Sequence, residues 1–317
     1  MNTHRTLSVL FATSLTAWAV AADTTPKPAE PGTLLVLDAA GKEQKLKAWK
    51  FTGGVRRLTW LAPAKAAETK DAADKDKKPA PKGKRTVIAP VGPEALSLRA
   101  ETGDGLFAEG VLTLIPLDRL RALDYDNEEN TVTVDAGEKL IGTTKYKQIN
   151  KLVIEAEVDK GELGIAEIKY LGGYPHGIRG VRFPAPKAAP PPPDGRRVLV
   201  VSADSKSSKT THKVVDLLPL YRLPDGGEKL LPTLMFKKTL KLDVGKIKKI
   251  VTAGAEEGAW QVTLKDGGDE TLTLLETIPF EGKQARLLGF VGRVPVGYKL
   301  FPSSAIAEIT FDATEDK

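Results

Sequence analysis

The feature that most limits the fold of this 317-residue chain is an internal repeat. Residues 112–137 align with residues 240–267 so that apolar side chains coincide at four positions and basic side chains at two. The apolar pairs are Ile115/Leu242, Leu117/Val244, Leu120/Ile247 and Leu123/Ile250, and the basic pairs are Arg119/Lys246 and Arg121/Lys248. A repeat of this length is typical of a structural unit that occurs twice.

The repeat continues beyond these segments in the same order. Val132–Val134 aligns with Val262–Leu264 after a three-residue slip, and residues 178–183 align with residues 306–311. Further matches are Gly137/Gly267, Gly161/Gly289, Gly164/Gly292 and Tyr170/Tyr298. We interpret the Gly-x-x-Gly pairs as tight turns before a strand, because glycine tolerates positive φ.

The local pattern of the repeat is that of β structure. Apolar residues at 152–158, 262–264 and 272–274 alternate with polar ones, a period that buries one face of a strand. Residues 117–123 instead have an apolar spacing of three, which predicts one helical or 3₁₀ turn between two strands. Asp225-Gly226 and Asp266-Gly267 have the chemistry of hairpin turns.

A strand, a short turn over residues 242–250 and a V-T-L-x-D-G hairpin together resemble small SH3-like or Sm-like β-barrels. The resemblance covers about half of the chain and implies no activity, because such barrels have many roles. We therefore expect an all-β protein of two tandem related units, each a small barrel or sandwich of short antiparallel strands. The first unit spans residues 32–183, the second spans 196–313, and a Pro-rich linker at 184–195 joins them.

The N-terminus has the pattern of a secretory signal peptide over residues 1–21. Arg5 precedes an apolar run at 7–17, and Ala19-Val-Ala21 is a small-x-small cleavage site. The alternative is an uncleaved anchor helix, but the run is short for a membrane span. The chain has no cysteine and so no disulfide. We expect a secreted or periplasmic protein with no stable membrane span after cleavage.

Residues 63–85 form a low-complexity insert in the first unit. The insert has no Leu, Ile, Val, Phe or other aromatic residue, and its net charge of +4 accounts for most of the +6 of the whole chain. A segment that buries so little apolar surface is expected to be disordered. The remaining residues are then nearly neutral, so we predict no nucleic-acid partner.

We expect the insert to be replaceable by a short Gly/Ser link without loss of fold. Loop closure costs only about 0.6 kcal/mol per doubling of loop length, so the change should be neutral or slightly stabilising. Thermal melting of the deletion variant beside the full mature chain tests this. A fall in melting temperature above about 5 °C would mean that the insert packs on the units.

The sequence lacks the residue patterns of the common catalytic classes. It contains three histidines in total and none of the Gly-x-Ser-x-Gly, phosphate-loop or dinucleotide-binding motifs. The acidic run at 124–128 imitates part of a calcium loop, but Glu129 stands where such loops need glycine. We therefore predict an acidic surface turn there, no metal, no cofactor and no enzymatic activity. Paired carboxylates of a glycosidase remain open, because their spacing is spatial and not sequential.

Two groups of side chains are candidate ligand contacts. The first combines aromatic residues with arginines (Trp49, Trp60, Arg56, Arg57), and the second is a basic cluster (Lys246, Lys248, Lys249). The alternative for the aromatic residues is a core position, since Trp49 and Phe51 lie two apart on a strand. The alternative for the lysines is a solvent-facing position that guards an edge strand.

These patterns favour a secreted, non-catalytic binding or structural module of the cell envelope that acts through duplicated β units. Its partner would be another protein or an envelope polymer, and the sequence leaves the ligand and the oligomeric state open. The alternative is a carbohydrate-binding accessory domain or a carbohydrate-active enzyme. The carbohydrate alternative requires Trp49, Trp60 or Trp260 to lie on an exposed face.

Overall fold

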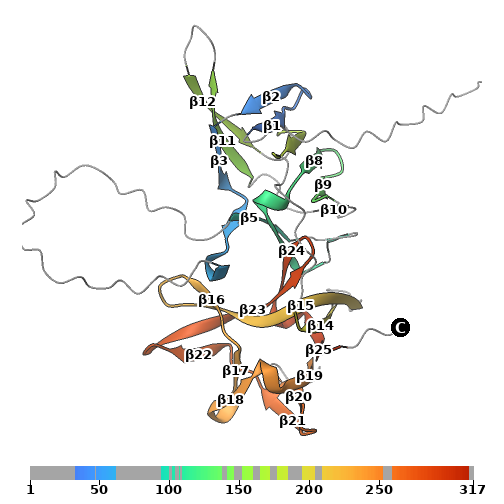
Figure 1. Cartoon of the computed structure of the whole chain (residues 1–317), viewed down its shortest axis with the longest axis vertical. Coiled ribbons are helices and arrows are strands. Elements are labelled where there is room, and N and C mark those ends of the chain that lie inside the picture. Colours follow the sequence, from blue (N-terminus) through green and yellow to red (C-terminus); the bar gives the residue numbers. More distant parts are fainter. Residues whose placement is uncertain are drawn as a thin grey trace, which may run out of the picture.

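A computed structural model gives the arrangement of the chain (Figure 1). It describes residues 33–46, 48–61, 94–99, 102–103, 107, 109–137, 141–145, 152–159, 165–171, 177–184, 195–203, 209–252 and 259–313. The predicted signal peptide, the 63–85 insert and most of the 184–195 linker lie outside these residues.

The described residues form mainly β-strands. Those before the linker are β1 (Leu34–Leu37), β2 (Glu43–Leu46), β3 (Ala48–Gly53), β4 (Val55–Arg57), β5 (Glu94–Arg99), β6 (Thr102–Gly103), β7 (Leu112–Pro116), β8 (Ala122–Asp126), β9 (Thr131–Asp135), β10 (Ile141–Lys145), β11 (Val153–Asp159), β12 (Ile165–Leu171) and β13 (Gly180–Arg182). Those after the linker are β14 (Arg197–Ala203), β15 (Lys209–Arg222), β16 (Glu228–Leu230), β17 (Thr233–Phe236), β18 (Leu240–Asp243), β19 (Ile247–Thr252), β20 (Ala259–Leu264), β21 (Asp269–Thr273), β22 (Thr277–Phe280), β23 (Lys283–Val294), β24 (Gly297–Phe301) and β25 (Ile306–Phe311). The all-β prediction is confirmed: the sheets are antiparallel, and in the described part none of them closes on itself.

The helical turn predicted from the spacing of three is present. A 3₁₀ turn, η2 (Leu117–Arg119), joins β7 to β8, and another, η6 (Val244–Lys246), joins β18 to β19. In η6 the carboxylate of Asp243 accepts a hydrogen bond from the backbone N–H of Gly245 at 2.6 Å. The hairpin glycines Gly226 and Gly267 adopt φ of 84° and 97°, as the Asp-Gly turns predict.

The strands before and after the linker pair in the same order. One sheet runs β2-β1-β13-β8-β9-β10, and the second half of the chain runs β15-β14-β25-β19-β20-β21. Strand β3 pairs with β11 and β11 with β12, as β15 pairs with β23 and β23 with β24. The hairpin of β5 with β7 likewise has the place of the hairpin of β17 with β18.

The pairings correct the sequence alignment at one place. Leu123 lies opposite Val134, and Ile250 lies opposite Val262, so Val134 and not Val132 has the position of Val262. A shift by two residues keeps every side chain on the same face of the strand, so the alternation of apolar residues does not detect it.

A second correction concerns the predicted glycine turns. Gly289 and Gly292 lie inside the long strand β23, whereas Gly161 and Gly164 lie outside the described residues. A Cβ on Gly289 would lie 2.2 Å from the carbonyl oxygen of Phe301, and one on Gly292 would lie 2.7 Å from Val214. These glycines permit close approach of neighbouring strands instead of forming turns.

The two halves of the chain meet through one continuous sheet. Strand β24 pairs with β7, with Tyr298 opposite Leu114 and Leu300 opposite Leu112, so a single sheet extends from β21 to β4. Figure 1 shows β24 beside the first half of the chain. A small apolar cluster draws on both halves at this junction: Leu58, Ala95, Leu114, Leu220, Val291 and Leu300.

Candidate functional site

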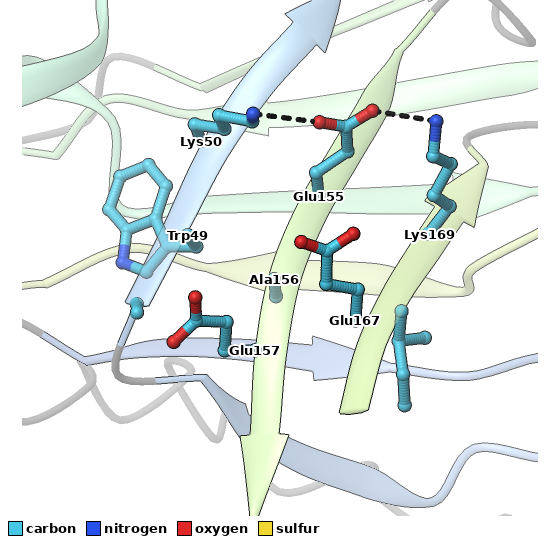
Figure 2. Close-up of a pocket in the computed structure, with 9 residues that line it drawn as sticks. Trp49, Lys50, Glu155, Ala156, Glu157, Glu167 and Lys169 are labelled. Carbon is cyan, nitrogen blue, oxygen red and sulfur yellow. Dashed lines mark ion pairs between the residues drawn. The ribbon is translucent and has the colours of Figure 1, made fainter. Parts of the chain in front are cut away.

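The exposed face of the sheet β3-β11-β12 holds a row of three charged side chains (Figure 2). Glu155 lies at the centre, opposite Lys50 on one neighbouring strand and Lys169 on the other. Its carboxylate oxygens lie 2.8 Å from Nζ of Lys169 and 3.0 Å from Nζ of Lys50. Hydrogen bonds from Lys169 and then from Lys50 lower the pKa of Glu155, and the same contact raises the pKa of Lys169.

A pair of carboxylates lies next to this row. Glu157 and Glu167 are directly opposite each other on β11 and β12, and both are exposed. No hydrogen bond or ion pair joins either of them to another residue that the structure describes. Like charges in directly opposite positions destabilise a sheet, so a positively charged group bound here would remove an unfavourable interaction.

Trp49 precedes Lys50 on β3 and lies opposite the buried Ala156, so its side chain points to the core-facing side of this sheet and not to the charged face. It is half-buried, packs against the main apolar core, and its ring meets the ring of Phe51 edge-on with centroids 5.5 Å apart. The prediction that Trp49 and Phe51 face one core is therefore confirmed. Trp49 also helps to line an open pocket of about 340 Å³ together with the charged residues above. The charged side chains on the exposed side of this pocket include the carboxylates of Glu157 and Glu167.

The other aromatic and arginine candidates lie elsewhere, at the junction of the two halves. Arg56 forms an ion pair of 2.5 Å with Glu228, and its guanidinium lies 5.6 Å from the ring centroid of Trp60. Trp60 also meets Tyr298 edge-on. Arg57 lies 3.6 Å from Glu94 on the neighbouring strand. Arg56 and Trp60 thus contact residues of the second half, and the structure does not bring them together with Trp49.

The basic candidates surround the turn η6. Lys246 ends this turn, and Lys248 is an exposed residue of β19. Lys249 is on the same strand, and its Nζ lies 2.9 Å from Glu308 of β25. One of the three charges therefore has a carboxylate partner in the sheet.

A buried polar cluster was not predicted from the sequence. Nε2 of His212 lies 2.8 Å from Oγ of Ser202, and its Nδ1 lies 3.3 Å from Nζ of Lys299. A charged Lys299 only donates, so Nδ1 accepts and Nε2 donates to the serine. Burial, followed by the charge of Lys299, lowers the pKa of His212 to about 4. Burial also lowers the pKa of Lys299.

This cluster is part of the core and not a hydrolase site. Ser202 is 3% exposed and His212 is 7% exposed, so a substrate has no access to the hydroxyl. Trp260, which the sequence placed on a possible carbohydrate surface, is likewise buried, with 4% exposure, and stacks on Phe290. That expectation for Trp260 is wrong. Strand β20 lies between β19 and β21, and the side chain of Trp260 is on the side of β20 that faces the core.

The remaining acidic candidate is a turn between β8 and β9. The carboxylate of Asp126 accepts hydrogen bonds from the backbone N–H groups of Glu128 and Glu129 at 3.0 and 2.9 Å. Its oxygen is thus engaged by the turn itself. No group of three or more His, Asp or Glu side chains suited to a metal ion is found in the described part of the chain.

The chain has no match among protein-family models, curated proteins or solved structures. Across the described residues, no helix is both long and apolar enough to cross a membrane.

Proposed function

We propose that this chain is a non-catalytic, exported binding module of the cell envelope, built from two duplicated β units. The shared order of strand pairing in the two halves supports the duplication, and the signal-like N-terminus supports export. The exposed face of β3-β11-β12 is its ligand surface in this proposal. The observation that carries the proposal is the pair Glu157 and Glu167, two exposed carboxylates without a partner in the described structure.

The chemistry of this face selects a positively charged group. Lys50 and Lys169 exceed the charge of Glu155 by one, and the carboxylates of Glu157 and Glu167 bring the formal net charge of this face to −1. A lysine or arginine side chain of a partner protein would pair with both carboxylates. We therefore propose a protein partner that presents a basic segment.

Replacing Glu157 and Glu167 together by glutamine is expected to weaken binding of a hexalysine peptide by about tenfold or more, because both charges that attract it are removed. Isothermal titration of the full mature chain at low salt measures this. Glu270→Gln, an exposed change on β21, is the matched control and should leave the affinity unchanged. Equal binding by the double variant and the control would refute the assignment of this face.

The alternative of a carbohydrate-binding module or a carbohydrate-active enzyme rests on Trp49, which lines the same pocket as the carboxylate pair. A sugar ring stacked on the indole would change the fluorescence of the tryptophan, and Trp49→Phe identifies which tryptophan reports. A fluorescence response to a soluble polysaccharide that Trp49→Phe abolishes, with no affinity for hexalysine, would favour this alternative. Release of reducing sugar that the Glu157→Gln and Glu167→Gln changes abolish would favour an enzyme.

A further inference from the structure

The junction between the two halves uses one edge of each half. The second half contributes β24, the strand at the end of the series β15-β23-β24. The first half contributes β7, the second strand of its β5-β7 hairpin. Each strand thereby has hydrogen-bonded neighbours on both sides.

The equivalent edges remain unpaired at the two ends of the molecule. Strand β12 has the position of β24 in the first half, and within the described residues only β11 pairs with it. Strand β18 has the position of β7 in the second half, and only β17 pairs with it there. Figure 1 shows β12 and β18 at opposite ends of the molecule, far from each other. The two therefore do not close on each other within one chain.

We propose that a second copy of this chain docks at these edges, with β18 of one copy pairing with β12 of the next. The contact would repeat between copies the strand pairing that β24 and β7 make inside one copy. An exposed edge strand presents unpaired backbone N–H and C=O groups that another strand satisfies. This inference rests on the pairing order and on the charges of the two edges, and it does not require an added ligand.

The charges of the two edges support this occupant. Strand β12 holds Glu167 and Lys169 with Glu157 opposite Glu167, a formal net charge of −1. Strand β18 holds Lys241 and Asp243 and lies close after Lys237 and Lys238, a formal net charge of +2. Glu157, Glu167 and these three lysines are all exposed. Opposite charges on facing edges favour pairing of β12 with β18 over pairing of β12 with itself.

Such a contact is heterologous, because the two surfaces in it are different. A heterologous contact leaves one free edge at each end of a pair, so association continues into a filament or a ring. The mature chain should therefore show a mass that rises with concentration, measured by sedimentation velocity without added ligand. A single monomeric species over the accessible range would overturn the proposal.

Two charge-reversed variants test the pairing itself. One carries Glu157→Lys and Glu167→Lys, which alters the β12 edge, and the other carries Lys237→Glu and Lys241→Glu, which alters the β18 edge. All four changes are at exposed positions, so neither variant should lose its fold, and circular dichroism verifies this. Each variant alone should associate at least about tenfold more weakly than the unaltered chain.

An equimolar mixture of the two variants gives the most specific result. Each retains one unaltered edge, and the two reversed edges again carry opposite charges, so the mixture should recover the concentration-dependent association that each variant alone has lost. Lys283→Glu, an exposed change at the start of β23, should associate like the unaltered chain. A mixture that stays monomeric, like each variant alone, would contradict pairing of β12 with β18. Because no hexalysine or polysaccharide is present, failure here is distinct from failure of the proposed ligand surface.

Discussion

Replacing Gly297 with alanine is expected to separate β24 from β7 and to cause a large loss of stability. Gly297 begins β24 with φ of 154°, a conformation that residues with a side chain rarely adopt. A Cβ at this position would lie 2.3 Å from the carbonyl oxygen of Leu114 and 2.7 Å from Cδ of Pro116. Both neighbours belong to β7, and one of the two atoms is backbone, so local side-chain movement does not relieve the overlap.

The consequence reaches the apolar cluster at the junction. Movement of β24 away from β7 would expose Leu114 of the first half and Leu300 of the second half. Both are buried in the apolar cluster at the junction. Backbone strain and lost burial together should cost about 3–5 kcal/mol. For a domain of this size that corresponds to a fall in melting temperature of roughly 10 °C. Thermal and urea unfolding of the mature chain measure this loss.

Gly282→Ala is the matched control for backbone strain. Gly282 has φ of 76°, and a Cβ there would have no atom within 4 Å. This change should cost only the conformational penalty, about 1–2 kcal/mol. If the two variants lose the same stability, close packing of β24 on β7 at Gly297 is not the cause.

The second large effect is a loss of stability as the pH falls from about 6.5 to about 4. The pKa of His212 is lowered from 6.5 to about 4 in the folded protein, because burial and then Lys299 disfavour its charged form. Between these two pH values the unfolded chain binds more protons at this histidine than the folded chain does. Stability therefore rises with pH across this window and is lost as the pH falls through it.

The size of this effect is at most about 3 kcal/mol, since one pKa unit corresponds to 1.36 kcal/mol. Asp312 acts in a separate range: hydrogen bonds from Arg196 and then Lys265 lower its pKa from 3.8 to about 2, so its contribution is lost only below the histidine window. Urea unfolding at several pH values between 4 and 7 measures the histidine effect without interference from Asp312.

His212→Gln should flatten the stability profile between pH 4 and 6.5. Glutamine keeps an amide group that can hydrogen-bond to Ser202 but has no titratable proton. His176→Gln removes the other histidine of the predicted mature chain and should leave the slope unchanged. A slope that persists in His212→Gln would show that another group causes it.

Local patterns were sufficient for the turns and strand types. The spacing of three at residues 117–123 predicted a short turn, and Pro116 limited it to the 3₁₀ turn that is found. Asp225-Gly226 and Asp266-Gly267 predicted turns with positive φ, because their geometry depends on a few adjacent residues.

The same patterns aligned the sequence of β9 with that of β20 two residues out of register. They also placed Trp260 on an exposed face, although it is buried. Strand periodicity repeats every two residues, so it is unchanged when one strand slides by two along its neighbour. Similarly, periodicity tells which residues share a face but not which face another part of the chain covers. Trp260 is buried because distant residues such as Phe290 pack on it.

The candidate ligand surface was likewise predicted only in part from local sequence patterns. Trp49 was singled out for its chemistry, but Glu155, Glu157, Glu167 and Lys169 were not, since they are ordinary charged residues of alternating strands. These residues form a candidate site only because β3, β11 and β12 lie side by side in the folded sheet, which places Glu157 opposite Glu167.

The sequence by itself determined the all-β class and the short turns, because each depends on neighbours along the chain. Only the tertiary structure decided that β24 pairs with β7, that β12 and β18 lie unpaired at the ends of the described sheets, and that Lys299 lies beside His212. Contacts of this kind join residues far apart in sequence. Any edge strand offers the same backbone groups, so the choice of partner depends on packing of the whole molecule.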